Sequence, residues 1–290
     1  MTLAIAHRGD TTGFRENTLP AIRSAIDHGA HMVEIDLDRT SDGHVVLMHA
    51  EAQGRLWALP RPITEMTLAE IASLGVEVEQ RIPTLMEVLA AVSYPRPTQL
   101  MLVANSVDTV LAADNLVHEH GMADQVLYSG SVEALRAIRA RRPSAGLVLT
   151  WDRPALPPAE LWQTLRPRYY STQYRLLTRD LVTEVHRHGY GLAAWMVNDF
   201  PEMARLIGMG VDAIITDHMT ELVKLTGDLN GQGASQEFTV APSAPSSGHD
   251  QQSRGSNGVN GVTAGRRTSL TSGTQGGGPT ISEPRFHVLE

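Results

Sequence analysis

The chain has 290 residues, of which 42% are apolar and 19% charged, as in a soluble globular protein with a sizeable core. It contains no cysteine, which excludes disulfides, thiolate metal sites and cysteine nucleophiles. Its formal net charge of -8 argues against electrostatic binding to nucleic acid, which depends on lysine and arginine.

The N-terminus and the apolar runs indicate where in the cell the protein is expected. Met1 leads into a short apolar run that Arg8 and Asp10 follow, so no signal peptide is readable. No apolar run approaches the roughly 20 residues that a membrane-spanning helix needs. We therefore expect no membrane span and a cytoplasmic protein.

The chain opens with a strand, a loop and a helix. The apolar run Leu3–Ala6 predicts a buried strand that delivers His7 and Arg8 at its C-terminal end. Thr18 is a candidate helix cap, and Gly29 lies where the helix should end.

A hairpin follows. Met32–Leu37 predicts a second strand, in which alternation places Glu34 and Asp36 on one face. Val45–Met48 returns as a short strand that ends at His49. The hairpin should bring His49 back beside the two acids.

The rest of the chain alternates helices and strands. After helices at 67–74 and from 83 onward, strands are expected at Leu100–Ala104, Val126–Ser129, Gly146–Thr150, Tyr169–Ser171, Leu192–Val197 and Ala213–Thr216. Helices should fill the gaps at about 107–120, 131–141, 158–165, 178–188, 200–207 and 218–225, with Gly189 and Gly208 at two of their ends. Apart from the hairpin return, eight strands are each followed by helix. This predicts an α/β protein with a (β/α)8 TIM barrel over residues 1–226, close to the typical size of about 250 residues.

The composition changes after Gly227. Gly, Ser, Thr, Gln, Asn and Pro dominate, with few large apolar residues. Such a segment buries too little surface to offset the entropy of ordering, so we expect residues 227–290 to be a low-complexity, mostly disordered tail.

The polar residues at the ends of the first strands suggest a phosphate-ester site, because barrel active sites lie where the strands end. Glu34 and Asp36 would hold a divalent cation, and Arg8 would bind phosphate. His7 and His49 would divide the proton transfers. Taken singly, a strand-end histidine is more often structural and a Glu-x-Asp pair more often a salt-bridged edge. The conjunction, in this order, is the stronger evidence.

A set of ordered motifs over about residues 3–220 resembles the glycerophosphodiester phosphodiesterase family. These motifs are His7-Arg8-Gly9, Glu16-Asn17-Thr18, Gly29-Ala30, Glu34-Ile35-Asp36, Thr40-Ser41-Asp42-Gly43, His49, Ile82-Pro83-Thr84-Leu85, Trp195-Met196-Val197-Asn198 and 210–217. The resemblance implies that His7 and His49 are the acid/base pair, that Arg8 binds phosphate, and that Glu34 and Asp36 hold a metal. The family commonly cleaves glycerophosphodiesters to glycerol phosphate and an alcohol, and relatives close a cyclic phosphate instead.

The chain departs from the family pattern and is therefore identified as a divergent member. The family usually has an aspartate after the second histidine, where this chain has Ala50. Val103 and Asn105 occupy the positions of a Glu-x-Lys pair that supplies a third metal ligand and a phosphate contact. Two carboxylates plus waters favour Mg²⁺ over Ca²⁺. Asp38, Glu51 or water are candidates to replace the third ligand.

Other residues have two interpretations. Glu16 and Asn17 either line the substrate site or order the first loop. Trp195 and Asn198 either line the cleft or pack in the core and form a turn. Asp217 could cap the last helix.

Three functions remain open from the sequence. The leading one is a metal-dependent phosphodiesterase acting on a glycerophosphodiester or a related small phosphorylated ester. The second uses the same site to form a cyclic phosphate or to eliminate phosphate or diphosphate. The third is an inactive barrel that binds a phosphorylated ligand. The sequence leaves the alcohol and the oligomeric state open.

Overall fold

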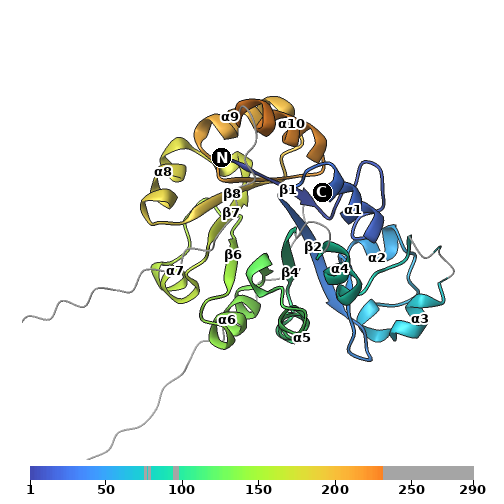
Figure 1. Cartoon of the computed structure of the whole chain (residues 1–290). Helices are drawn as coiled ribbons and strands as arrows, with labels where there is room; N and C mark the ends of the chain where they lie inside the picture. Colours follow the sequence, from blue (N-terminus) through green and yellow to red (C-terminus); the bar gives the residue numbers. More distant parts are fainter. Residues whose placement is uncertain (75–76, 78–79, 94–97, 231–290) are drawn as a thin grey trace, which may run out of the picture. The chain divides into compact units, whose positions relative to one another are not determined.

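The computed structural model describes residues 1–74, 77, 80–93 and 98–230. Eight parallel strands form its centre: β1 (Leu3–His7), β2 (Met32–Arg39), β4 (Gln99–Ala104), β5 (Val126–Gly130), β6 (Gly146–Thr150), β7 (Tyr169–Gln173), β8 (Gly191–Trp195) and β9 (Ala213–Thr216). They pair in the order β1-β9-β8-β7-β6-β5-β4-β2, and pairing of β1 with β2 closes the ring (Figure 1). The predicted (β/α)8 barrel is confirmed.

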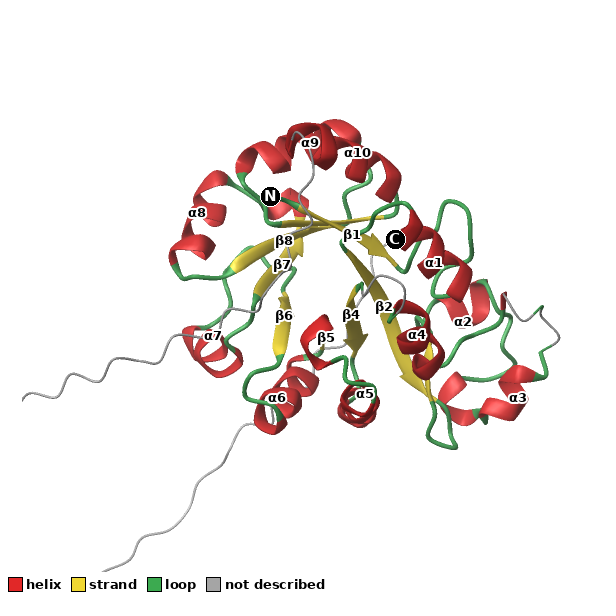
Figure 2. Cartoon of the chain, in the orientation of Figure 1, coloured by secondary structure: helices red, strands yellow, loops and turns green. Residues whose placement is uncertain are grey.

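Helices surround the strands (Figure 2). They are α1 (Leu19–Asp27), α4 (Leu85–Val92), α5 (Val107–Glu119), α6 (Val132–Arg141), α7 (Ala159–Leu165), α8 (Arg179–Arg187), α9 (Phe200–Met209) and α10 (Met219–Asn230). Between β2 and α4 the chain makes an excursion through β3 (Val45–Leu47), α2 (Ala52–Arg55) and α3 (Leu68–Ala72). In the part of the chain that the structure describes, no helix combines the length and the apolar character needed to cross a membrane.

Side-chain caps begin several of the helices that follow the strands. The Thr18 side chain accepts a hydrogen bond from the Ala21 amide, and the Asp199 side chain accepts one from the Glu202 amide. Ser131 and Thr178 cap α6 and α8 in the same way, as the sequence predicts. Each cap satisfies a backbone donor that the helix itself leaves free, which stabilises a helix by about 1 kcal/mol.

Several element ends differ from the predicted ones, and three of the differences have a visible cause or consequence. Strand β8 stops at Trp195, whereas Val197 is buried beyond it. The run of buried apolar residues therefore extends past the hydrogen-bonded strand. Helix α9 continues through Gly208 and ends at Met209, followed by Gly210, whose φ of +87° suits a left-handed C-cap. Helix α10 continues to Asn230, past the boundary expected at 226. The remainder of the predicted tail lies outside the described residues.

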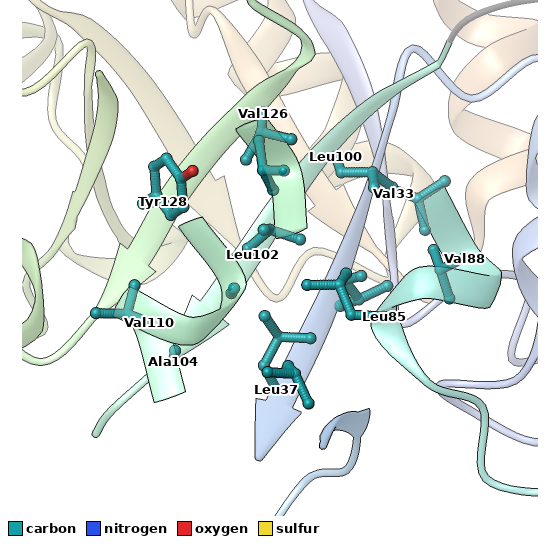
Figure 3. Close-up of a cluster of buried hydrophobic side chains, with 14 of the residues drawn as sticks. Val33, Leu37, Leu85, Val88, Leu100, Leu102, Ala104, Val110, Val126 and Tyr128 are labelled. Atoms are coloured by element: carbon teal, nitrogen blue, oxygen red, sulfur yellow. The ribbon is translucent and has the colours of Figure 1, made fainter. Parts of the chain in front are cut away.

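Alternation along the strands separates two apolar layers. Val33, Ile35 and Leu37 point outward and pack with helix residues such as Leu85 (Figure 3). A second set fills the barrel interior and includes Leu3, Ile5, Met32, Met101, Leu127, Val148, Tyr169 and Ile215. On β2, the inward positions that follow Met32 are occupied by Glu34 and Asp36, which places these two acids at the mouth of the barrel.

Gly9 lets the first helix pack closely against the end of β1. Its φ is +93°, and a Cβ there would lie 2.7 Å from Ala21 Cβ and from the Ala21 carbonyl carbon. The Asp10 amide donates a 2.8 Å hydrogen bond to the Ala21 carbonyl at this contact. A side chain at position 9 would therefore separate α1 from the strand that carries His7 and Arg8.

This close contact predicts that Gly9→Ala destabilises the fold more than Gly43→Ala. Both glycines have a φ of +93°, but a Cβ at Gly43 would meet nothing within 4 Å. The backbone strain of about 1–2 kcal/mol should therefore be shared, and only Gly9→Ala should add a steric term of at least about 1 kcal/mol. Urea unfolding of the two variants measures the difference. Equal losses in the free energy of unfolding would contradict the packing argument.

Candidate functional site

A cavity of about 370 Å³ lies at the C-terminal ends of the barrel strands. Of the predicted site residues, His7, Glu34 and Trp195 line it, together with Val103 and Asn105 at the positions where the chain departs from the family. The other lining residues are Met101, Ser129, Gly130, Thr150, Asp152, Ser171, Met196 and Ile215. No lysine or arginine is among the described residues of this lining.

The carboxylate of Asp217 lies against the ring nitrogen of His7 that faces away from Glu34. Its Nδ1 lies 2.7 Å from Asp217 Oδ1, and its Nε2 lies 3.7 Å from Glu34 Oε2. Burial lowers the pKa of His7, but the hydrogen bond with Asp217 and the charge of Glu34 outweigh it and raise the pKa above its usual value. Asp217 therefore binds side chains of the site.

Arg8 belongs to a charged network under the first loop. Its Nε lies 2.8 Å from Asp36 Oδ2, and its Nη1 donates to Glu16 Oε1 at 2.9 Å. Arg55 pairs with the other Glu16 oxygen at 2.7 Å. Asn17 donates to Asp36 Oδ2 at 3.0 Å and accepts from the Asp36 amide at 3.1 Å.

This network is built on unusual backbone geometry. Arg8 and Asn17 have φ values of +59° and +55°, in the left-handed region that non-glycine residues seldom adopt. The Arg8 amide donates to the Glu34 carbonyl, and the Asn17 amide donates to the Arg8 carbonyl. Glu16 and Asn17 thus order the loop and hold Arg8 and Asp36, and neither lines the cavity.

Glu34 is the least satisfied acid of the site. It is 7% exposed, and its Oε2 is buried without a hydrogen-bond partner. Burial is the main cause that raises the pKa of Glu34 to about 7, with a contribution from the charge of Asp36. A cation next to this oxygen would stabilise the ionised carboxylate and so lower the pKa of Glu34.

His49 arrives on the predicted hairpin. β3 runs antiparallel to β2, and the Met48 amide donates to the Asp36 carbonyl at 3.0 Å. The Nδ1 atom of His49 is buried and has no hydrogen-bond partner. Burial lowers the pKa of His49, although the charge of Asp36 opposes this shift. The two histidines therefore have unlike surroundings, one paired with a carboxylate and one not.

Comparison with known proteins identifies the family of the chain. The profile of the glycerophosphoryl diester phosphodiesterase family matches residues 7–221. The chain belongs to this family. A glycerophosphodiester phosphodiesterase of Caldanaerobacter subterraneus subsp. tengcongensis is 30% identical over 77% of the chain and 97% of that protein.

Two solved phosphodiesterase structures share the fold. A phosphodiesterase of Oleispira antarctica, solved with its product sn-glycerol-3-phosphate, is 25% identical with a TM-score of 0.69, covering 78% of this chain and 97% of that one. A glycerophosphodiester phosphodiesterase of Thermotoga maritima is 26% identical with a TM-score of 0.65, covering 78% and 99%. Membership and these relatives support glycerophosphodiester phosphodiesterase activity, that of a phosphoric diester hydrolase.

The acids of β2 fit a partial cation site. The family generally uses a divalent cation, and the unpartnered Glu34 oxygen beside Asp36 suits one. Val103 pairs in register with Asp36, so an apolar side chain stands where a third ligand would complete the set. Within 1–230, excluding the undescribed gaps, no group of three His, Cys, Asp or Glu side chains is placed to hold a metal. Neither Asp38 nor Glu51, the candidates to replace that ligand, lines the cavity.

The sequence interpretation missed the far wall of the cavity. This wall carries Ser129, Thr150, Asp152 and Ser171, each at or just beyond the end of a predicted strand. The rule that barrel sites gather at strand ends would have found them. Single hydroxyl residues at strand ends are common, however, and only the closed barrel brings these together around one space.

The burial of Glu34 predicts a pH dependence of stability for the metal-free protein. Between pH 4.5 and about 7 the unfolded carboxyl has lost its proton while the folded one retains it, so the free energy of unfolding falls as the pH rises. Glu34→Gln should show a shallower fall over this window. Denaturant unfolding with chelator at both ends of the window measures the slope, and equal slopes would contradict the shifted pKa.

Proposed function

We propose that this protein hydrolyses a glycerophosphodiester, or a related small phosphorylated ester, to a phosphomonoester and an alcohol by acid–base catalysis. The observation that carries the proposal is His7, which faces Glu34 in the cavity at the mouth of the barrel while Asp217 holds its other ring nitrogen. The product bound to the Oleispira antarctica relative supports a small phosphorylated ligand for this site.

The histidines divide the proton transfers in this proposal. One takes a proton from the attacking water as the water oxygen bonds to phosphorus. The other gives a proton to the alcohol oxygen as its bond to phosphorus breaks, so the alcohol leaves neutral. Arg8 binds a phosphate oxygen, for which its guanidinium must exchange part of its pairing with Glu16 and Asp36.

A divalent cation is part of the proposed site. Glu34 and Asp36 would hold it, and when bound it would neutralise phosphate charge as a Lewis acid. Mg²⁺ is favoured over Ca²⁺, because Mg²⁺ commonly uses one or two carboxylates, several waters and substrate phosphates. Val103, in register with Asp36, has no ligand oxygen, so a water or a phosphate oxygen would have to complete the coordination.

Trp195 supplies an apolar wall to the cavity and is proposed to contact the substrate. Glu16 and Asn17 act mainly by holding Arg8 and Asp36. We propose a division into a barrel at 1–226 and a separate tail, with the last turn of α10 continuing past that boundary to Asn230. We also retain the proposal of a cytoplasmic protein, which the lack of cysteine supports.

The substitutions at positions 50, 103 and 105 favour one alternative, attack by a substrate hydroxyl to give a cyclic phosphate. They remove groups that help position the ordinary substrate in the family. Phosphorus NMR of the products separates the reactions. A linear monoester formed without a transient cyclic species supports hydrolysis, and an accumulating cyclic product supports the alternative.

Removal of either histidine should abolish most turnover. His7→Ala and His49→Ala are each expected to lower kcat by about 10²- to 10⁴-fold, because each removes a proton-transfer group. His120→Ala, at an exposed residue whose Nδ1 bonds within its own helix, is the matched control. The assay follows a panel of phosphodiesters with Mg²⁺ present. Unchanged turnover in either site variant would overturn the assignment of that histidine.

A carboxylate at position 103 should strengthen cation binding. Val103→Glu would place an oxygen ligand beside Asp36 and tighten Mg²⁺ binding by at least about tenfold, since added ligand charge raises affinity. Val103→Gln has the same length without the charge and serves as the control. Calorimetric titration with Mg²⁺ gives both affinities. If the two variants bind Mg²⁺ equally, position 103 does not adjoin the cation.

A further inference from the structure

We propose that Asp217, anchored by Asn198, is a positioning residue that holds the His7 imidazole with its Nδ1–H turned away from the cavity and Nε2 turned toward the reacting phosphate. The inference rests on the proposed function for its catalytic consequence. Its structural basis is a contact between residues 210 positions apart, at the ends of the neighbouring strands β1 and β9.

The geometry determines which ring nitrogen carries the hydrogen. Burial raises the pKa of Asp217, but hydrogen bonds from His7, Asn198 and Thr11 outweigh it and hold the pKa at about 2. The ionised carboxylate can only accept, so His7 Nδ1, at 2.7 Å, must donate. In the neutral ring this leaves Nε2 as the free lone pair, on the side of Glu34 and the cavity.

The carboxylate cannot easily rotate, because both of its oxygens are bound. Asn198 Nδ2 donates to Asp217 Oδ2 at 2.8 Å, and Thr11 Oγ1 donates to Oδ1 at 3.3 Å. In return, Asn198 Oδ1 accepts from the Asp217 amide at 2.9 Å and from Thr216 Oγ1 at 3.0 Å. The loops after β1, β8 and β9 are thereby joined around one imidazole.

The other site histidine has no such support. Ala50 follows His49, and the Nδ1 atom of His49 is buried without a hydrogen-bond partner. Between the two histidines of the site, the carboxylate-held imidazole is therefore His7. Loss of Asp217 would leave both imidazoles without a carboxylate that sets their tautomer.

The test substitution is Asp217→Asn, which preserves shape but reverses the hydrogen bond. Because Asn198 Nδ2 donates to one oxygen of Asp217, the oxygen of the new amide should face Asn198 and its NH₂ group should face His7. The NH₂ group would then donate to Nδ1 and place the ring hydrogen on Nε2. Nitrogen NMR detects this change of tautomer, with the His7 signals assigned from their loss in His7→Gln.

The kinetic readout separates positioning from folding. Asp217→Asn should lower kcat by about 10- to 100-fold with KM changed less than about twofold, the range seen when a group that orients a site residue is removed. Asn198→Ala, which removes the anchor but keeps the carboxylate, should cause a smaller loss of kcat. Thermal unfolding of each variant reports any loss of folded protein.

Asp212→Asn is the matched control. Asp212 Oδ2 lies 2.7 Å from His186 Nε2 and also accepts from the Leu192 amide, in a His–Asp pair outside the cavity. Its substitution should reduce stability to a similar extent while kcat is unchanged.

Two outcomes would overturn the proposal: an unchanged His7 tautomer in folded Asp217→Asn, or a changed tautomer with wild-type kcat. If the wild-type protein turns over no phosphodiester, the proposed function fails, whereas the NMR measurement still decides whether Asp217 sets the tautomer.

Discussion

Burial of two like charges on one strand is the constraint on which the site depends. Glu34 and Asp36 are each 7% exposed at the end of β2, where ionised carboxylates are costly unless they are paired. Asp36 is compensated by Arg8 and Asn17, whereas Glu34 has only the more distant His7, at 3.7 Å, and no hydrogen bond to its buried oxygen. The raised pKa of Glu34 expresses the remaining cost, and a cation that binds there would remove it.

The same constraint explains the strained first loop. Arg8 reaches Asp36 only because the chain turns sharply after β1, with Arg8, Gly9 and Asn17 all at positive φ. Hydrogen bonds from Arg8 to the Glu34 carbonyl and from Asn17 to the Arg8 carbonyl hold that turn. Strain of this kind persists where surrounding contacts over-determine the backbone, and here those contacts also position the charged groups.

The remainder of the cavity is less charged. Across from His7 and Glu34, the ends of β4 to β7 contribute Val103, Asn105 and hydroxyl residues, with Asp152 as the one charged residue among the described lining of that side. In the proposed reaction, phosphate charge would therefore be met on the side of β1 and β2, by Arg8, the histidines and a cation. The opposite side is left to shape and neutral hydrogen bonding, which suits contact with the alcohol portion of a substrate.

Local patterns were enough to predict the barrel, because the strands show apolar runs and several helices have their own cap residues. Polar residues at the ends of the first strands also indicated His7, Arg8, Glu34, Asp36 and His49 as candidates for the site. Asp217 was different. From the sequence its side chain could equally cap a helix, and only closure of the ring through the pairing of β1 with β9 brings it to His7. The far wall, with Asp152 and three hydroxyl residues, was likewise missed, since each is an ordinary residue near a strand end and only the closed barrel brings these separate strands around one space. Which elements form depends on neighbouring residues, whereas which side chains share a hydrogen bond depends on contacts across hundreds of residues that only the folded barrel creates.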